Sequence, residues 1–330
     1  YTGTGNDNNS ITGVGFQPDF TWIKERSSTS SHALWDVVRG VTKKVESDND
    51  QAEGTDATGL KSFDSDGFTL GTSPQVNQSG VTNVAWNWKA GNAQGSSNTD
   101  GSINTTYTSV NTTAGFSISQ YTGNGSAGAT VGHGLGAVPG LIFIKNLSSG
   151  STDWGVYHKS LGGTKALFLD LANQADTNIK YFNNTDPTNQ VFSLGTYNDE
   201  NANGENYIAY CFAEKTGYSK FGSYTGNANA DGTFIYTGFK PAFVMVKKSA
   251  GTGYWVIQDN KRTSSSGTNP NDKWIYPNVS DAEFDASSYP MDLLSNGFKL
   301  RHTGNYQNSS TNYIYMAFGQ SLVGTNNVPC

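Results

Sequence analysis

PDFTWIK, residues 18–24, is the stretch that decides the fold, because the chain repeats it as PGLIFIK (139–145) and PAFVMVK (241–247). Proline lacks a backbone N–H and is tolerated at the start of a strand. Successive residues of a strand point to opposite faces, and here both faces are apolar, which predicts a strand covered on both sides. We interpret the stretch as a core strand copied with its surroundings. The lysine that closes it is expected where the strand leaves for solvent.

Four further blocks recur in the same order around this strand. Tyr-Thr-Gly precedes it, and an aromatic strand, a Phe-x-Leu triplet and a second aromatic strand follow it. Twenty residues separate the Phe of the triplet from the end of the last block in every copy. The starting tyrosines are Tyr1, Tyr121 and Tyr224, and the following blocks are HALWD (32–36), WGVYH (154–158) and WVIQD (255–259); Phe68, Phe192 and Phe298; and NVAWNW (83–88), YIAYCF (207–212) and YIYMAF (313–318).

The repeat predicts an all-β protein of three tandem antiparallel β-sandwich domains, jelly-roll or lectin-like in type. A period of about 100 residues is too long for a solenoid, whose repeats span roughly 20–50 residues. Each copy is also large enough to bury a core of its own. The predicted domains are 1–91, 115–217 and 218–330, with a Ser/Thr/Asn-rich linker at 92–114. A partial strand pattern in the linker indicates that some of it packs.

Composition supports this fold class and excludes several functions. Only 15% of the 330 residues are charged and 12% are aromatic, and there are 39 glycines, which favours strands and turns over helices. The net charge of −6 argues against nucleic acid as a partner. No apolar run is long enough for membrane insertion. With Cys211 and Cys330 alone, a disulfide framework is not expected. Because residue 1 begins a repeat, we expect a fragment or processed product.

The motifs predict neither catalysis nor a metal or cofactor. FDSDGF (63–68) resembles part of a calcium loop but lacks the closing Glu, so we interpret it as an Asp-Gly turn. The four histidines have no zinc-ligand spacing. A glycosidase pair, Asp36 with Asp64 or Asp66, is conceivable, but the second copy has His158 at the position of Asp36. We therefore predict a protein that is not an enzyme.

The aromatic side chains are the candidate binding residues. Seven Trp and 17 Tyr exceed what three small cores require. Trp and Tyr stack on the apolar faces of sugars, and surfaces of Tyr and Trp with Ser, Gly and Asn also build protein paratopes. The alternative is that they are core or interface residues. The candidates for glycan or receptor binding, all on the most variable repeated strand, are Trp35, Asp36, Trp154, Tyr157 and Trp255.

Several stretches resemble a repeat of virion proteins from marine bacteriophages, cyanophages in particular. They are SNTDGSINTTYTSVNTTAGFSISQYTGNG (97–125), FDSDGFTLG (63–71), VAWNWKAG (84–91) and the closing AFGQSLVGTNNVPC (317–330). The resemblance covers most of the chain and is weakest at 260–292. It implies a tail-fibre or other virion structural protein with a lectin/glucanase-like sandwich. It carries no catalytic residues over to this chain.

These observations lead us to expect a non-enzymatic bacteriophage virion protein, part of a tail fibre, spike or other exposed appendage, that is assembled in the bacterial cytoplasm. It is expected to aid attachment to host-surface glycans and to contact other virion subunits in a homo-oligomer, with a trimer favoured. Three alternatives remain open: a capsid-decorating or purely architectural virion protein, a secreted bacterial carbohydrate-binding or adhesion module, and a polysaccharide depolymerase. An exposed aromatic cluster would favour the receptor binder, and a carboxylate pair in a groove would favour the depolymerase.

Overall fold

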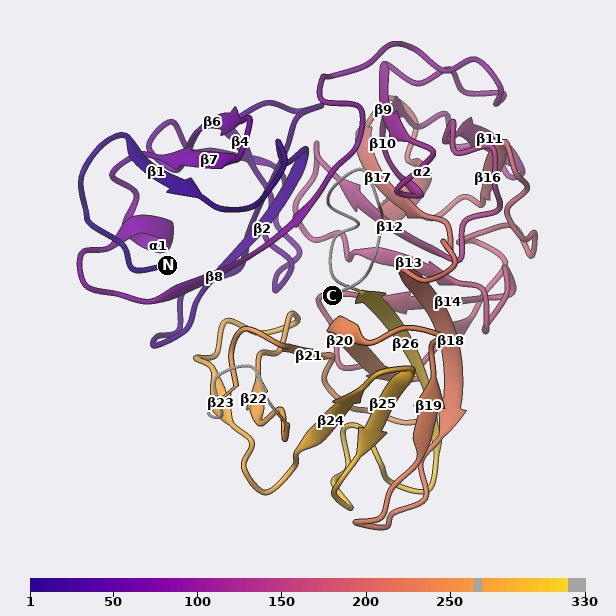
Figure 1. The fold of residues 1–330 in the computed structure, drawn as a ribbon. Helices are drawn as coiled ribbons and strands as arrows, with labels where there is room; N and C mark the ends of the chain where they lie inside the picture. Colours follow the sequence, from indigo (N-terminus) through magenta and orange to yellow (C-terminus); the bar gives the residue numbers. More distant parts are fainter. Residues whose placement is uncertain (264–268, 320–330) are drawn as a thin grey trace.

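The computed structural model describes residues 1–263 and 269–319, and in it strands dominate (Figure 1). We divide the chain into an N-terminal segment (1–91), a middle segment (92–217) and a C-terminal segment (218–319). The N-terminal segment contains β1 (Asn9–Thr12), β2 (Phe20–Glu25), β3 (Ala33–Asp36), β4 (Lys43–Lys44), β5 (Gly54–Thr55), β6 (Leu60–Asp64), β7 (Gly67–Leu70), α1 (Pro74–Asn77) and β8 (Asn83–Trp88).

The other two segments continue the series. The middle segment contains β9 (Tyr107–Asn111), β10 (Phe116–Thr122), β11 (Ala129–Gly132), β12 (Leu141–Asn146), β13 (Gly155–His158), β14 (Lys165–Phe168), β15 (Asp176–Thr177), β16 (Val191–Leu194), α2 (Asn198–Asn201) and β17 (Asn206–Phe212). The C-terminal segment contains β18 (Ser219–Thr225), β19 (Phe234–Tyr236), β20 (Pro241–Lys248), β21 (Val256–Asp259), β22 (Lys273–Trp274), β23 (Phe284–Asp285), β24 (Met291–Leu294), β25 (Gly297–Leu300) and β26 (Asn312–Gly319). In the part of the chain that is described, neither helix is long and apolar enough to cross a membrane.

Each segment holds an antiparallel sheet built on the strand after the repeated proline and a second antiparallel sheet. We call them the larger and the smaller sheet, although both have three strands in the N-terminal segment. The pairs β4-β5 and β22-β23 form two further sheets. The larger sheets have the orders β3-β2-β8, β15-β14-β13-β12-β17-β10-β9 and β18-β26-β20-β21. In all three, the last long strand of the segment lies beside the strand that follows the repeated proline. The smaller sheets are β1-β7-β6, β11-β16 and β19-β25-β24. The predicted all-β, antiparallel class is confirmed.

Part of the predicted linker is built into a sheet. Strand β9 pairs with β10 along the edge of the middle sheet, from Tyr107 opposite Gln120 to Asn111 opposite Phe116. Further back, Ile103 forms a bridge with Val131 and is buried. The stretch from 92 to 114 therefore includes an edge strand of the middle segment as well as connecting loops.

The strand after each proline is central and buried, as the repeat predicts, but its lysine is not at the surface. All six residues of β2 and of β12 are buried. Lys24, Lys145 and Lys247 are buried too, which corrects the expectation that they mark an exit to solvent. Their ammonium groups donate to backbone carbonyls instead, for example to Thr152 O at 2.6 Å and Asn173 O at 2.6 Å.

One hydrophobic cluster lies between the three larger sheets and draws on all three segments. At its centre the rings of Trp88, Phe212 and Phe318, the ends of the three last strands, lie 5.8–6.2 Å apart in every pairing. Four further clusters each lie within one segment. Three of them lie between the larger and smaller sheets, and the fourth surrounds Trp274 and Tyr276. The expectation that each copy relies on a core of its own is therefore incomplete, because the largest core is shared.

Three equivalent hydrogen bonds join the segments into a closed ring. Trp154 Nε1 donates to Glu46 O at 2.9 Å, so the middle segment contacts the N-terminal one. Trp255 Nε1 donates to Phe168 O at 2.7 Å, from the C-terminal to the middle segment. His32 Nε2 lies 3.1 Å from Tyr276 O and joins the N-terminal to the C-terminal segment. The three accepting carbonyls hold equivalent positions. Each belongs to the residue that comes directly after one that pairs with the aromatic strand of the same segment.

Candidate functional site

The five residues proposed from the sequence as a binding surface lie in the interior. Trp35, Asp36 and Trp154 are 0% exposed, and Tyr157 and Trp255 are 2% exposed. They belong to or adjoin β3, β13 and β21, which are enclosed by their neighbours. A ring with no exposed face offers nothing for a sugar to stack on. The structure thus corrects the expectation of an accessible surface at these residues. Asp36, Trp154 and Trp255 contact neighbouring segments, whereas Trp35 and Tyr157 lie in the cores of their own segments.

The carboxylates considered as a catalytic pair have structural partners. Asp36 accepts hydrogen bonds from Arg39 Nε at 2.5 Å and from the hydroxyl of Tyr210 at 2.7 Å, on the neighbouring segment. Asp64 accepts from the hydroxyls of two nearby side chains. Asp66 accepts from two glycine N–H groups in the loop after β1. Each carboxylate thus fixes local structure.

The C-terminal segment contains an aromatic pocket of about 430 Å³. Trp274 on β22 pairs with Phe284 on β23, and their rings lie 6.1 Å apart. Tyr289 stacks near Trp274 at 5.3 Å, and Tyr306 reaches in from the loop before β26. Trp274 is 2% exposed, whereas Phe284 is 42% and Tyr289 36% exposed. The aromatic pocket therefore has an indole floor and an exposed aromatic rim; its lining is Trp274, Tyr276, Phe284, Tyr289, Gly304, Asn305 and Tyr306.

The aromatic pocket also holds polar groups. The Nε1 atom of Trp274 is buried and has no hydrogen-bond partner. The Nε1 atom of Trp35, in the core of the N-terminal segment, is unpartnered in the same way, so this feature alone does not indicate a ligand. The exposed amide of Asn305 lies at the edge, where its Oδ1 accepts from Lys248 Nζ at 3.0 Å. Burial raises the pKa of the Tyr276 hydroxyl, so that group is neutral and able to donate.

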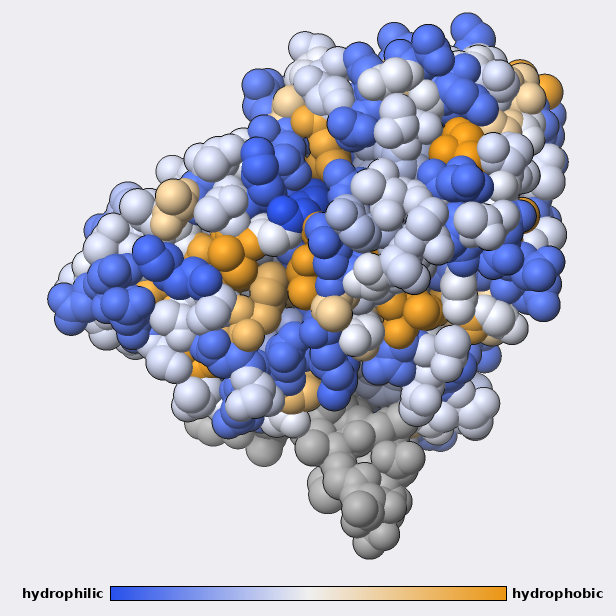
Figure 2. Space-filling model, turned by 90° about the horizontal axis from the view of Figure 1, so that it is seen from above, coloured by the Kyte–Doolittle hydropathy of each residue, from blue (hydrophilic) through white to orange (hydrophobic). Residues whose placement is uncertain are grey.

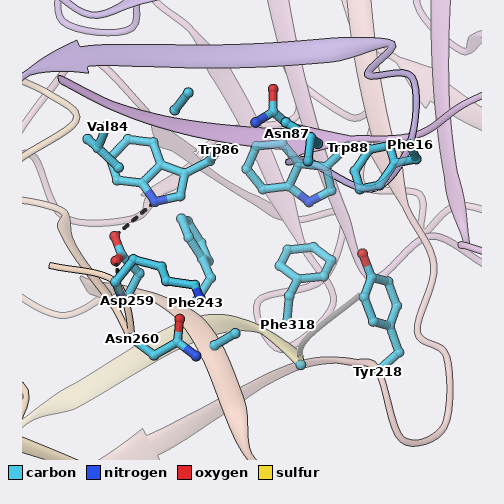
Figure 3. Close-up of a pocket in the computed structure, with 15 residues that line it drawn as sticks. Phe16, Val84, Trp86, Asn87, Trp88, Tyr218, Phe243, Asp259, Asn260 and Phe318 are labelled. Carbon is cyan, nitrogen blue, oxygen red and sulfur yellow. Dashed lines mark hydrogen bonds between the residues drawn. The ribbon is translucent and has the colours of Figure 1, made fainter. Parts of the chain in front are cut away.

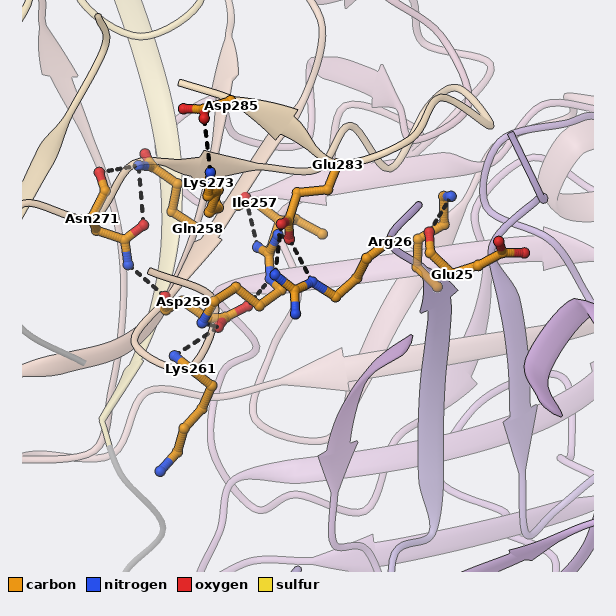
Figure 4. Close-up of polar contacts among 12 residues, drawn as sticks. Glu25, Arg26, Ile257, Gln258, Asp259, Lys261, Asn271, Lys273, Glu283 and Asp285 are labelled. Carbon is orange, nitrogen blue, oxygen red and sulfur yellow. Dashed lines mark hydrogen bonds and ion pairs between the residues drawn. The ribbon is translucent and has the colours of Figure 1, made fainter. Parts of the chain in front are cut away.

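The rim of the aromatic pocket is held in place by an ion-pair chain to the N-terminal segment (Figure 4). Arg26, which follows β2, makes two hydrogen bonds to Glu283 at 2.7 and 2.9 Å, and the Glu283 N–H donates to Arg26 O. Arg262 also contacts Glu283 at 2.9 Å and Asp259 at 2.6 Å. Because Glu283 directly precedes Phe284, these bonds anchor one wall of the pocket.

The corresponding hairpins elsewhere in the chain are filled differently. The pair Lys44 and Gly54, on β4 and β5, stands where the C-terminal segment has Trp274 and Phe284. There Lys44 Nζ bonds Gln75 Oε1 at 2.5 Å and Glu46 Oε1 at 2.8 Å. A polar network thus occupies this hairpin in the N-terminal segment. The hairpin therefore forms there without Trp274 and Phe284 counterparts.

Sequence reasoning missed the aromatic pocket because its hairpin residues fall in 260–292, where the third copy departs from the pattern. The departure was itself the available signal: Trp274 and Phe284 stand at positions that the other copies fill with Lys or Ala and with Gly or Asp. Elsewhere the face in Figure 2 is mainly hydrophilic, with apolar side chains gathered in a few small patches.

The described residues contain no group of three or more His, Cys, Asp or Glu side chains able to hold a metal ion. Cys211 is a buried free thiol, and Cys330 lies outside the described residues.

The sequence profile of a family described as a domain of unknown function (DUF7483) matches residues 1–321. No curated protein matches the chain. No solved structure matches it either.

Proposed function

This chain belongs to the family described as a domain of unknown function (DUF7483), and from that premise we propose that its aromatic pocket binds a carbohydrate. The observation that carries the proposal is the exposed rim of Phe284 and Tyr289 around the floor formed by Trp274. Aromatic faces cover the C–H face of a sugar ring, and the exposed amide of Asn305 at the edge can bond a hydroxyl. The volume of about 430 Å³ lies within the range of small-molecule sites and suits one or two sugar units.

The wider proposal is a non-enzymatic structural protein of a bacteriophage virion, exposed on a fibre, spike or similar appendage and attached to host-surface glycans. The sequence resemblance supports this role, and the recurring strand orders support three tandem, lectin-like sandwiches related by an internal repeat. Other virion subunits are the proposed partners, in a homo-oligomer with a trimer favoured.

A polar environment at the equivalent hairpin distinguishes this proposal from a purely architectural one. An architectural protein has no need to replace the Lys44, Glu46 and Gln75 network by an open cavity with the floor of Trp274 and the rim of Phe284 and Tyr289. An aromatic cavity edged by the exposed Asn305 amide is better explained by a ligand that has both an apolar face and hydroxyls.

The test is isothermal titration calorimetry of the chain with purified bacterial surface polysaccharides and with their component monosaccharides. A single stacked sugar with one or two hydrogen bonds is expected to bind with a dissociation constant of about 1 mM, near −4 kcal/mol. Phe284→Ala should weaken binding about tenfold, because an aromatic contact contributes about 0.5–1.5 kcal/mol. Phe234→Ala is the matched control, since Phe234 is 43% exposed on β19.

Two results would contradict the proposal: no sugar in the panel binds, or Phe284→Ala and Phe234→Ala weaken binding equally. New reducing ends released from a polysaccharide during the titration would instead support the depolymerase alternative.

A further inference from the structure

A second pocket, in the middle segment, is the counterpart of the aromatic pocket. It has a volume of about 630 Å³ and lies beside β14 and β15. Ala166 pairs with Asp176 on these strands, just as Trp274 pairs with Phe284 in the C-terminal segment. We call this cavity the polar pocket; its principal lining residues are Asp153, Asn173, Gln174, Asp176, Tyr181 and Tyr197.

The polar pocket combines one exposed aromatic ring with several hydrogen-bonding groups. Tyr197 is 36% exposed, and its ring is backed by that of Tyr181 at 4.7 Å between centroids. The side chains of Asn173, Gln174 and Asp176 are exposed around it. Among the described residues, no lysine or arginine lines this cavity. Such a lining suits an uncharged sugar, whose ring stacks on tyrosine and whose hydroxyls bond amide and carboxylate groups.

One short loop of the C-terminal segment, residues 249–253, separates the polar pocket from the aromatic pocket. On one side, Gly251 lines the polar pocket, and its N–H donates to Gln174 Oε1 at 2.9 Å. On the other side, the loop leads into Tyr254, whose ring stacks on Tyr306 of the aromatic pocket at 5.4 Å. The two pockets are therefore neighbours, although they belong to different segments.

The loop between the two pockets carries only small side chains. Its sequence is Ser-Ala-Gly-Thr-Gly, so none is larger than threonine. Gly251 has a φ of +96°, a conformation that favours glycine. Lys248, just before the loop, donates from Nζ to Asn305 Oδ1 at 3.0 Å and so holds that amide at the edge of the aromatic pocket. The loop therefore presents no bulky side chain to a ligand that runs from one pocket to the other.

We propose that the aromatic pocket and the polar pocket form one groove, which binds an uncharged polysaccharide chain across the boundary between the C-terminal and middle segments. The proposal rests on the proposed sugar binding by the aromatic pocket, and it adds the class of ligand. One or two sugar units fill the aromatic pocket, and the next units cross residues 249–253 and stack on Tyr197. The carboxylates of Asp153 and Asp176 accept hydrogen bonds from hydroxyls, and their charge disfavours an acidic polysaccharide.

The test compares single sugars with longer fragments in isothermal titration calorimetry of the full chain. The fragments are prepared by partial acid hydrolysis of each uncharged polysaccharide in the panel. Fragments of about four units should bind at least about tenfold more tightly than single sugars, because a second aromatic contact and further hydrogen bonds are added. One fragment should bind per chain. Tyr197→Ala should abolish this gain and change single-sugar binding less than about twofold, whereas Tyr197→Phe, which keeps the ring, should retain the gain.

Two further variants separate binding from folding. Asp176→Ala removes an exposed carboxylate of the polar pocket and should weaken the binding of four-unit fragments severalfold, with the urea midpoint of unfolding unchanged. Phe16→Ala is the control, because Phe16 is a partly exposed aromatic residue in a different groove, between β8 and the C-terminal segment (Figure 3). It should leave the binding of every fragment unchanged.

The continuous groove is overturned if the longer fragments bind no more tightly than single sugars, if two fragments bind per chain, or if Tyr197→Ala and Phe16→Ala have equal effects. It is also overturned if fragments of an acidic polysaccharide bind more tightly than uncharged fragments of the same length. In each of these cases, single-sugar binding that Phe284→Ala weakens would still support the aromatic pocket as a sugar site. If no sugar binds at all, both proposals fail, so the two failures are distinguishable.

Discussion

Replacing Phe212 by alanine tests whether the three segments share one core. Phe212 is 1% exposed, and its ring lies 4.7 Å from Phe116 and 5.8 Å from Phe318. It also contacts Trp88, on the N-terminal segment, at 6.2 Å. Buried Phe→Ala substitutions cost about 3–5 kcal/mol, and the rigid strands around this ring leave little room for collapse. We expect a loss of about 4 kcal/mol, a large part of the roughly 5–15 kcal/mol by which folded proteins are stable.

The free energy of unfolding is measured in urea, with fluorescence and circular dichroism as the two signals. Amide hydrogen exchange is measured separately in β8, β17 and β26. Phe212→Ala should speed exchange in all three strands, because each contributes to the shared cluster. The matched control is Phe192→Ala, equally buried but in the cluster confined to the middle segment. It should cost a similar free energy and speed exchange mainly in that segment.

The reasoning is refuted if Phe212→Ala costs less than about 1 kcal/mol. It is equally refuted if exchange accelerates in β17 alone, since the segments would then open independently of the central rings.

Three further predictions concern buried charge and the pocket rim. Glu200 is buried with both carboxylate oxygens unpartnered, and burial raises the pKa of its carboxyl. The folded state therefore favours the neutral acid, and it loses stability as pH rises above the ordinary pKa of glutamate. Glu200→Val should therefore stabilise the fold by about 1–3 kcal/mol at pH 8 and by less at pH 5 in urea unfolding, and a larger gain at pH 5 would contradict this. Burial lowers the pKa of Lys247 to about 7, so the free energy of unfolding should rise by about 1–2 kcal/mol between pH 7 and 9, and this part of the rise should vanish in Lys247→Met. Arg26→Ala removes the two bonds that fix Glu283 beside Phe284 and should weaken sugar binding severalfold in calorimetry, whereas Lys220→Ala, near the start of β18, should not.

The sequence predicts the strands well and their environment less well. The repeated proline stretch identifies β2, β12 and β20 as central strands, because apolar residues on both faces require cover on both. The apolar pattern does not identify which part of the chain packs on each face. It therefore could not show that one face of each strand packs against the other segments. The buried lysines illustrate the same limit. Lys247 reads as a surface residue until the carbonyls of Ala172 and Asn173, more than 70 residues away, are seen to surround it.

The aromatic pocket could not be predicted by the same means. A repeat identifies what the copies share, whereas Trp274 and Phe284 occupy positions at which the copies differ. Trp274 and Phe284 occupy two-residue strands, too short to show an alternating pattern. Their pairing depends on the turn between them and on the anchoring of Glu283 by a residue of the first segment.

The closed ring of contacts has a consequence for the growing chain on the ribosome. His32 is synthesised 244 residues before its partner Tyr276. At about 5–20 residues per second, the first segment waits roughly 10–50 s for the contact that closes the circle. During that interval Trp86 and Trp88 lack their eventual neighbours Phe243 and Phe318 in the last segment. The nascent N-terminal segment is therefore a transient client for chaperones, and slowing translation late in the message should lower the soluble yield.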